Sequence, residues 1–358
     1  MHIRHFRINN FRNITTSDIT FHPHINLIEG LNGSGKTSLL EALYFISHGR
    51  SFKANQLNRI IQHDCAETTL FAEITHTKMQ KTLALQKNKN GQTELRLNHI
   101  SVNTQSELTR SLPIQLLHPG SFAILTSGAK YRCQLLDWGA FYSQNKFHLL
   151  WRKAKQLIRQ RNSLLKQNPS QSMLKPWDYE LAICGSELNE LRFSYMNKFQ
   201  KEINQLLPTF SQQPVKFDYY RGWSNQEELA DTLQKYLAQD IKSGFTHYGP
   251  HRADLRITTN HLPASDVLSR GQQKLLILAL KLAQGALFYQ EHQTPCIYLI
   301  DDLLSELDEN ATNTVLEFLK NQKAQIFISA INTKYIANTL SNDEYHQFTL
   351  NNGKITAN

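Results

Sequence analysis

The sequence predicts an α/β protein in which a mixed sheet with flanking helices is interrupted by an inserted helical arm with coiled-coil character. Three observations predict this fold. A glycine-rich loop at Gly30–Thr37 stands between an apolar strand and a helix. A second apolar strand, Ile297–Ile300, is followed by two aspartates, and the long stretch between the two motifs has helical periodicity and many basic residues. We expect residues 1–122 and 243–358 to form the sheet-containing head and residues 123–242 to form the arm.

The composition is that of a folded, water-soluble protein. Hydrophobic residues make up 40% of the 358 residues and charged residues 19%, and no apolar run approaches the roughly 18 residues that a membrane helix needs. The segment Met1–Phe11 alternates polar and apolar residues without the core of a signal peptide, so we expect a first strand there. The four cysteines form no C-x-x-C pair and the fifteen histidines form no H-E-x-x-H motif, which argues against a disulfide framework or a zinc site. The absence of a disulfide pattern fits a reducing cytoplasm, so we expect a cytoplasmic protein.

Residues Gly30–Thr37, GLNGSGKT, match the phosphate-binding pattern G-x-x-x-x-G-K-[ST] at every position. An apolar strand at Ile25–Ile28 precedes the loop, and helical spacing of leucines resumes after it. We expect Lys36 to reach the β- and γ-phosphates as a candidate catalytic residue, and the Thr37 hydroxyl to ligate Mg²⁺. The expected nucleotide contacts are Gly30, Leu31, Asn32, Gly33, Ser34, Gly35, Lys36 and Thr37. The guanine-recognition sequence N-K-x-D is absent, which favours ATP over GTP.

A second motif follows the apolar strand Ile297–Ile300, where Asp301 and Asp302 occur together. A continuous apolar strand is typical of a parallel sheet covered on both faces, and its C-terminal end faces the ligand crevice. We therefore expect Asp301 to hold Mg²⁺ through a water molecule and Asp302 to orient or deprotonate the attacking water as a catalytic residue. The simpler interpretation is a pair of solvated turn aspartates. Gln325–Ala330 predicts the next strand and places Ser329 at the same edge.

The segment Val267–Leu276, VLSRGQQKLL, joins a polar run to an apolar helical stripe. Ser269 is a typical helix N-cap, so a capped core helix is the simplest interpretation. However, the order of phosphate loop, L-S-x-G-Q, Asp-Asp and S-E-L-D resembles the ATPase heads of ABC-type proteins. In that family the L-S-x-G-Q signature motif closes on the nucleotide held by a second head. The resemblance therefore implies an ATP-dependent homodimer in which the partner's nucleotide is contacted by Ser269, Arg270, Gly271 and Gln272.

Seven strings, in order, make the sequence similar to the RecF family of bacterial recombination-repair proteins over essentially the whole chain. They are NFRN (Asn10–Asn13), GLNGSGKTSLLEAL (Gly30–Leu43), GAKYRCQLLDW (Gly128–Trp138), HYGPHRADLRI (His247–Ile257), LSRGQQKLL (Leu268–Leu276), YLIDDLLSELD (Tyr298–Asp308) and FISAI (Phe327–Ile331). The resemblance implies ATP and Mg²⁺ as cofactors, binding to double-stranded or gapped DNA, and action with RecR and RecO in loading RecA. It implies no membrane partner.

Several positions depart from these family patterns. Compared with ABC-type proteins in general, Arg270 replaces a glycine and Asp302 replaces the catalytic glutamate, as in RecF-type proteins, and the shorter aspartate leads us to expect slow hydrolysis. Within the RecF pattern, Cys133 stands where a second basic residue is common and Ala253 where an acidic residue is common, so these two positions receive no role. Gln115 is a candidate for the loop glutamine that contacts Mg²⁺, although an ordinary strand glutamine fits equally well.

The predicted arm carries most of the chain's excess positive charge. The whole chain has a formal net charge of +9, and residues 130–201 hold thirteen lysines and arginines against five acidic residues. Periodicity predicts one amphipathic helix from Leu150 to Leu165, a break at Lys166–Pro176, and an antiparallel helix with a heptad seam from Trp177 to Tyr195. The basic residues of the first helix are Arg152, Lys153, Lys155, Arg159, Arg161 and Lys166. A solvated helix face would explain them, but the family resemblance favours contacts to DNA phosphates, and our candidates are Lys153, Lys155, Arg159 and Arg161.

Together these features favour an ATP-dependent DNA-binding protein of recombinational gap repair, in which nucleotide-driven dimerisation switches DNA binding. Two other functions stay open at this point. The ATPase subunit of a membrane transporter has the same kind of head, although the basic helical insertion and the RecF-like strings argue against it. The second is a nucleotide-gated clamp in which hydrolysis matters little. Full DNA-repair activity in a Lys36→Met variant would support this function.

Overall fold

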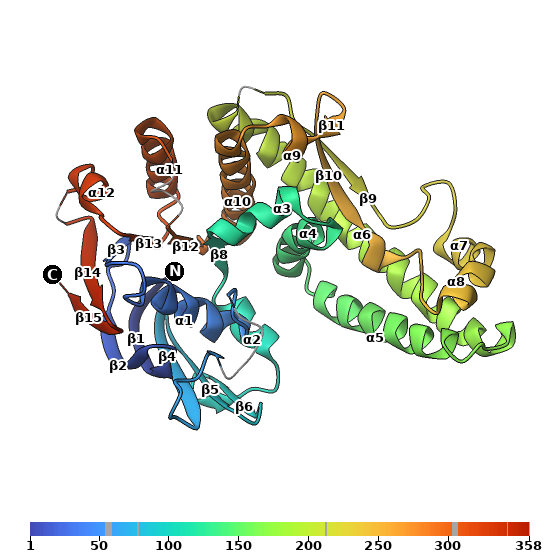
Figure 1. Cartoon of the computed structure of the whole chain (residues 1–358), viewed down its shortest axis with the longest axis horizontal. Coiled ribbons are helices and arrows are strands. Elements are labelled where there is room, and N and C mark those ends of the chain that lie inside the picture. Colours follow the sequence, from blue (N-terminus) through green and yellow to red (C-terminus); the bar gives the residue numbers. More distant parts are fainter. Residues whose placement is uncertain (54–58, 77–78, 212, 303–306, 342, 358) are drawn as a thin grey trace. The chain divides into compact units, whose positions relative to one another are not determined.

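The computed structural model describes residues 1–358 except 54–58, 77–78, 212, 303–306, 342 and 358. The chain forms two compact units, of which the first contains Met1–Gly120 and Phe288–Asn358 and the second contains Ser121–Leu287 (Figure 1). Among the described residues, no helix is both long and apolar enough to span a bilayer.

The first unit contains an antiparallel sheet with the strand order β2-β1-β4-β5-β6-β7. Its strands are β1 (His2–Phe11), β2 (Ile14–Thr20), β4 (Glu67–His76), β5 (Met79–Asn88), β6 (Thr93–Leu97) and β7 (Ile100–Ser101). Successive side chains of a strand point to opposite faces, and in β4 every second residue is buried, including Leu70, Ala72 and Ile74. The strand predicted for the first eleven residues is confirmed as β1.

The second sheet of this unit is mixed, with the order β15-β14-β3-β13-β12-β8. Its strands are β3 (Ile25–Glu29), β8 (Ile114–Leu117), β12 (Ile297–Asp301), β13 (Ile326–Ala330), β14 (Tyr345–Asn351) and β15 (Lys354–Ala357). All neighbours are parallel except β14 and β15, which form an antiparallel hairpin. The predicted mixed sheet and its apolar central strands are therefore confirmed. Asp301 pairs with Ser329 and Ala330 pairs with Glu29, so the C-terminal ends of β3, β12 and β13 share one edge.

Helix α1 (Lys36–His48) belongs to one hydrophobic core that both sheets share. Phe6 of the first sheet, Leu40 and Phe45 of α1, and Leu299 and Phe327 of the second sheet are all fully buried in it. The other helices of the unit are α2 (Gln105–Ser111), α11 (Glu309–Asn321) and α12 (Lys334–Asn338). Because the core fixes both the second sheet and the start of α1, it also fixes the loop that joins them.

The second unit is mainly helical and contains a small sheet of order β11-β10-β9. Its elements are α3 (Ala123–Thr126), α4 (Ala129–Ser143), α5 (Phe147–Leu165), α6 (Gln171–Phe210), β9 (Lys216–Tyr220), α7 (Leu229–Lys235), α8 (Leu237–Ser243), η3 (Pro250–Arg252), β10 (Asp254–Thr259), β11 (Leu262–Pro263), α9 (Ala264–Val267) and most of α10 (Arg270–His292), while η2 (Pro119–Phe122) lies at the boundary.

The predicted helical hairpin is confirmed as α5 and α6, which lie side by side and antiparallel (Figure 1). The break between them is shorter than we predicted, since α6 begins at Gln171 and contains Pro176 in its second turn. The boundary we placed at residue 242 also differs from the observed one at Leu287. The reason is tertiary: β10 pairs with β9, and Gln284 of α10 donates a hydrogen bond to the Leu135 carbonyl at 2.7 Å.

Candidate functional site

The phosphate loop has the geometry that its glycines predict. It connects the end of β3 at Glu29 to the start of α1 at Lys36. Gly33 and Gly35 have φ angles of +83° and +115°, which residues with a side chain rarely adopt. A Cβ atom on Gly30 would lie 2.6 Å from the Leu350 carbonyl oxygen, so this position requires glycine because another strand passes close by.

The Lys36 side chain folds back along the loop rather than extending into solvent. Only 4% of Lys36 is exposed, and its Nζ donates to the carbonyl oxygens of Gly30 at 2.8 Å and Leu31 at 3.3 Å. The ammonium group is thereby held against the loop, where it could neutralise the charge of a phosphate bound there.

Oxygen atoms from three elements meet beside the loop. The Thr37 hydroxyl donates to Asp301 Oδ1 at 3.0 Å, and the Ser329 hydroxyl donates to the same oxygen at 2.8 Å. Mg²⁺ prefers such hard oxygen ligands and is typically held by one or two carboxylates together with substrate phosphates. Thr37 and Asp301 therefore fit a magnesium site, and Ser329 orients the carboxylate.

Asp302 is positioned by an unusual backbone conformation. Its φ angle is +52°, and its N–H donates both to the Ser329 hydroxyl at 3.0 Å and to the Ser329 carbonyl at 3.2 Å. A left-handed conformation of a non-glycine residue persists only where its surroundings fix it, and such positions cluster at functional sites. The conformation places Asp302 in the lining of the cavity that the phosphate loop borders.

This cavity has a volume of about 650 Å³ and is lined by Leu31, Asn32, Gly33, Gly35, Lys36 and Thr37 of the loop, together with Asp302. Seven further lining residues were absent from our candidates, namely Arg12, Asn13, Ser38, Lys53, Arg59, Ile61 and His63. Arg12 and Asn13 belong to the NFRN string, which served only to support the family resemblance. Arg12 is anchored by Glu41 of α1, with Nε–Oε2 and Nη2–Oε1 distances of 2.9 and 2.6 Å. These lining residues are brought together by packing between distant segments, so the sequence around each of them does not predict its place in the cavity.

The signature motif begins α10 in the second unit. The prediction that Ser269 caps this helix is confirmed. Gln272 N–H donates to Ser269 Oγ at 3.3 Å, and Ser269 N–H donates to Gln272 Oε1 at 2.9 Å, so the two residues form a capping box. Ser269, Arg270 and Gly271 are exposed, Gln272 is half-buried, and a Cβ atom on Gly271 would meet nothing within 4 Å. The motif is thus open to an external ligand. Ser305 and Glu306 of the S-E-L-D string lie outside the described residues.

Gln115 does not reach the edge where the metal ligands lie. In the register of β8 and β12 it pairs with Tyr298, three positions before Asp301. At the usual strand rise of about 3.3 Å per residue, it lies about 10 Å from that edge. Gln115 is also fully buried. The structure therefore corrects our proposal of a Mg²⁺-contacting glutamine at this position and favours the alternative, an ordinary strand glutamine.

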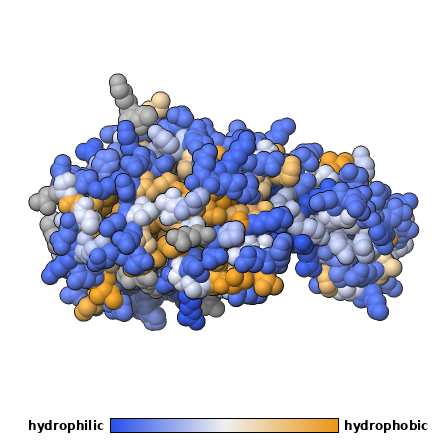
Figure 2. Space-filling view, turned by 90° about the horizontal axis from the view of Figure 1, so that it is seen from above, coloured by the Kyte–Doolittle hydropathy of each residue, from blue (hydrophilic) through white to orange (hydrophobic). Residues whose placement is uncertain are grey.

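The candidate nucleic-acid interface lies on α5, where Arg152, Lys153, Lys155 and Arg159 are exposed, and on its C-cap residue Lys166, which is also exposed. They do not all share one face. Arg152, Lys155, Arg159 and Lys166 follow one another at intervals of three, four and seven residues, so they form one stripe along the helix. Lys153 points elsewhere and forms an ion pair with Glu180 at 2.5 Å. At the right of Figure 2, the outer part of the arm presents a mostly hydrophilic surface.

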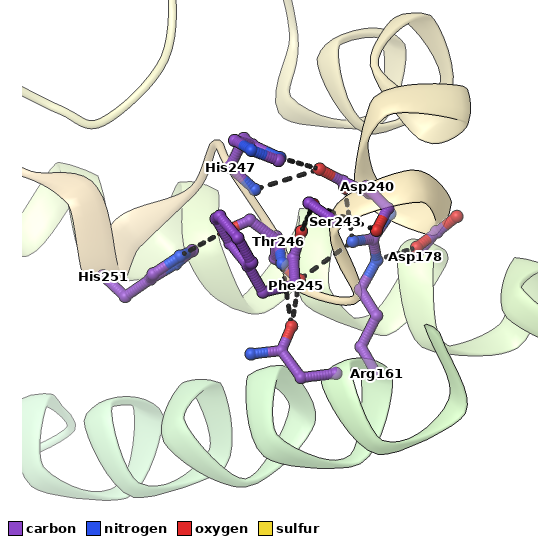
Figure 3. Close-up of polar contacts among 9 residues, drawn as sticks. Arg161, Asp178, Asp240, Ser243, Phe245, Thr246, His247 and His251 are labelled. Carbon is purple, nitrogen blue, oxygen red and sulfur yellow. Dashed lines mark hydrogen bonds and ion pairs between the residues drawn. The ribbon is translucent and has the colours of Figure 1, made fainter. Parts of the chain in front are cut away.

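Arg161 does not belong to this interface. It lies in the buried stripe of α5 between Leu157 and Leu165, and its side chain is 0% exposed. Its Nη1 donates to Asp240 at 2.6 Å and to the Thr246 hydroxyl at 2.9 Å (Figure 3). Our prediction of a DNA contact at Arg161 is thus corrected, because the guanidinium is enclosed by protein groups.

Three helices and one loop meet at Arg161. Nε of Arg161 donates to Asp178 of α6 at 2.6 Å, and burial raises the pKa of Asp178. Asp240 Oδ1 accepts hydrogen bonds from the backbone N–H of His247 at 3.0 Å and from its ring Nδ1 at 2.7 Å. The arginine therefore joins α5, α6, α8 and the loop that begins the HYGPHRADLRI string.

The two positions that depart from the RecF pattern lie against each other. The Cys133 thiol donates to the Ala253 carbonyl oxygen across a distance of 2.8 Å. Burial raises the pKa of Cys133 to about 12, so the thiol is protonated and able to donate. Arg132, its neighbour, forms a two-point ion pair with Asp254, with N–O distances of 2.7 and 3.1 Å. The departures are therefore spatially coupled, although they are 120 residues apart in sequence.

Comparison with known proteins agrees with this geometry. Residues 2–356 match the family model described as RecF/RecN/SMC N terminal domain. The DNA replication and repair protein RecF of Francisella tularensis subsp. novicida is 42% identical over 346 residues, covering 96% of this chain and 99% of that protein. The RecF protein of Francisella tularensis subsp. tularensis strain WY96-3418 has the same identity and coverage.

Solved structures show the same fold. A structure of the recombination mediator protein RecF with ATP, described as part of the RecFOR pathway, gives a TM-score of 0.90 at 24% identity, covering 100% of this chain and 97% of that one. An Smc head bound to the C-terminal winged-helix domain of ScpA gives a TM-score of 0.60 at 13% identity, covering 100% and 98%. With the strand–loop–helix site and the inserted helical hairpin, these matches show that the chain belongs to the RecF family of DNA replication and repair proteins.

Proposed function

We propose that this chain is an ATP-dependent DNA-binding protein of recombinational gap repair, active in the cytoplasm, and that ATP closes two heads into a homodimer. The observation that carries the proposal is the cavity of about 650 Å³ in which Lys36, Thr37 and Asp302 meet at one end of a phosphate loop. Membership in the RecF family argues against the transporter alternative, because the relatives are DNA replication and repair proteins.

In this proposal the phosphate loop binds the triphosphate of ATP through its backbone N–H groups, and Lys36 neutralises the β- and γ-phosphates. Thr37 and Asp301 would hold Mg²⁺, which when bound would supply positive charge to the phosphates. Asp302 accepts a proton from the attacking water or orients it. Since an aspartate reaches less far than the glutamate of most ABC-type heads, we expect hydrolysis to be slow and to act as a switch.

The signature motif supplies the second half of the site. Ser269 and Gly271 lie at the exposed start of α10, where a helix of 23 residues presents unpaired N–H groups and a positive dipole end. Such an end binds anions, and the γ-phosphate held by a second copy is the anion that this proposal requires. Two-fold symmetry then produces two composite sites in each dimer.

The stripe on α5 provides the DNA contact. Arg152, Lys155, Arg159 and Lys166 offer four positive charges on one exposed helix face, whereas Lys153 is already paired with an acidic residue. Phosphate contacts of this kind position a protein on DNA without reading its sequence, which suits a protein that acts at double-stranded or gapped DNA. We propose RecR, RecO and RecA as partners in the pathway, supported by the RecFOR pathway to which a similar structure belongs.

A DNA-binding titration over a range of salt concentrations, with and without ATP, tests the proposal. We expect ATP to tighten binding to duplex and gapped DNA, and the affinity to fall as salt rises because counterions are released from phosphates. Affinity that is insensitive to both ATP and salt would contradict the proposal. Full DNA-repair activity in a Lys36→Met variant would favour the nucleotide-gated clamp.

A further inference from the structure

The turn of the β14–β15 hairpin lies against the phosphate loop. Asn351 pairs with Lys354, so Asn352 and Gly353 form a two-residue turn, and their φ angles of +47° and +81° are those of a type I′ turn. Gly353 N–H donates to the Ser34 carbonyl oxygen at 2.8 Å. This hydrogen bond joins two segments that are more than 300 residues apart in sequence.

The bond acts on the orientation of one particular peptide group. The Ser34 carbonyl and the Gly35 N–H belong to the same planar trans peptide, in which the C=O and N–H bonds point in opposite directions. Holding the carbonyl toward the hairpin turn therefore directs the Gly35 N–H away from it. Gly35 lines the nucleotide cavity, so its N–H is one of the groups that can bind phosphate.

Asn13 supports the same peptide from a second direction. Its Nδ2 lies 3.4 Å from the Ser34 carbonyl oxygen, and a Cβ atom on Gly35 would lie 3.0 Å from that nitrogen. On its other side, the Asn13 carbonyl oxygen would lie only 1.9 Å from a Cβ atom on Gly353. The turn can reach the loop only because residue 353 has no side chain.

We propose that Gly353 is a positioning residue of the nucleotide site: by holding the Ser34 carbonyl, it keeps the Gly35 N–H directed at the phosphates. The inference rests on the proposed binding of ATP and adds a hairpin far from the known sequence motifs to the site. Nucleotide affinity then depends on a turn that touches the loop's backbone and does not touch the nucleotide.

Calorimetric titration of the full chain with ATP and Mg²⁺ tests this. Gly353→Asn is the informative variant, because asparagine adopts positive φ angles readily, while its Cβ still collides with Asn13. We expect the Kd for ATP to rise about tenfold, the scale of one lost hydrogen bond. Gly91→Asn is the matched control, since Gly91 has a φ of +86° in the exposed turn between β5 and β6 of the same unit.

Hydrogen exchange of the unmodified protein gives a second measurement that does not depend on a variant folding. Saturating ATP should increase the protection of the Gly353 amide and leave the Gly91 amide unchanged. Equal Kd values for Gly353→Asn and Gly91→Asn, or unchanged protection at Gly353, would overturn the inference. Failure of the unmodified protein to bind ATP at all would instead overturn the proposed function.

Discussion

Arg161 and Asp240 form a 2.6 Å ion pair whose side chains are 0% and 2% exposed. The pair joins α5 to α8 inside the second unit, and Asp178 adds a second carboxylate to the same guanidinium at 2.6 Å. A buried cation is retained only where its charge is compensated, so these two aspartates determine what Arg161 does. It stabilises the arm rather than contacting DNA.

Replacing Arg161 with methionine should therefore destabilise the protein without changing the electrostatics of DNA binding. Removing one partner of a buried ion pair leaves uncompensated charge and costs about 3–5 kcal/mol. Urea unfolding measures this free energy. Arg159→Met, two residues earlier on the exposed face, is the control and should change the unfolding free energy by less than about 0.5 kcal/mol. Similar losses for both variants would contradict the structural role.

Replacing Arg152, Lys155 and Arg159 together with alanine should weaken binding to all DNA sequences alike. Each phosphate contact that is lost should reduce the slope of log K against log salt by about 0.9. Fluorescence anisotropy at several salt concentrations measures that slope. Lys153→Ala serves as the comparison, because Glu180 already pairs with Lys153 and its removal should leave the slope nearly unchanged. An unaltered slope in the triple variant would show that this helix face is only solvated and does not contact DNA phosphates.

Lys36→Ala should lose most of its affinity for ATP. The lysine provides the cation nearest to the phosphates, and a hydrogen bond to a charged group contributes about 2–3 kcal/mol. Calorimetry detects the change, and Arg96→Ala removes a positive charge from an exposed strand of the same unit as a control. ATP affinity within about twofold of the unmodified protein would exclude the assignment of the phosphate loop.

Ser269→Arg should leave ATP binding by the monomer intact and prevent ATP-dependent dimerisation, because the arginine would occupy the space of the partner's γ-phosphate. Size-exclusion chromatography with a slowly hydrolysed ATP analogue measures assembly. A mixture of Ser269→Arg and Lys36→Ala chains places both defects in one composite site and leaves the other intact. Such a mixture should recover part of the hydrolysis that neither variant has alone. Normal assembly of the Ser269→Arg protein would show that Ser269 is only a helix cap.

Cys133 should resist alkylation in the native protein at pH 8. Burial raises its pKa to about 12, so at pH 8 only about one thiol in ten thousand is ionised, and the thiolate is the reactive form. Mass spectrometry after iodoacetamide treatment measures the modification. Unfolding in urea returns the pKa toward its usual value and should make Cys133 reactive. Rapid labelling of Cys133 in the folded protein would contradict its hydrogen bond to the Ala253 carbonyl.

The sequence was sufficient where chemistry is local. The strand, loop and helix around Lys36 are consecutive, and so are β12, Asp301 and Asp302, so their patterns predicted the elements that the structure contains. The roles of Lys36, Asp301 and Asp302 stay predictions. Helical spacing places Arg161 on the apolar stripe between Leu157 and Leu165 and Arg159 outside it, and our list of basic residues did not use this difference. What the sequence pattern could not predict is the pair of partners, Asp178 and Asp240 on other helices, that allows an arginine to be buried there.

The parts that were missed depend on contacts between distant segments. Arg12 joins the nucleotide cavity because Glu41 of α1 holds its guanidinium, and no pattern near residue 12 indicates this. The expected contact of Gln115 with the metal site was wrong because the apolar run around Gln115 predicts a strand but not the register of that strand against β12. In the observed register Gln115 pairs with Tyr298, three positions before Asp301. The extent of the second unit, up to Leu287, likewise follows from packing.

Ser269 in the capping box of α10 can make two interactions at once. A hydroxyl group has one proton to donate and two lone pairs to accept with, and the cap uses only a lone pair of Ser269, for the N–H of Gln272. The proton stays available to a phosphate oxygen even while the helix is capped. Helix capping therefore uses the oxygen atom of the Ser269 hydroxyl, and phosphate binding would use its hydrogen atom. An aspartate in this place would retain the cap but offer negative charge where a proton is required, so the helix would persist while its affinity for an anion disappears.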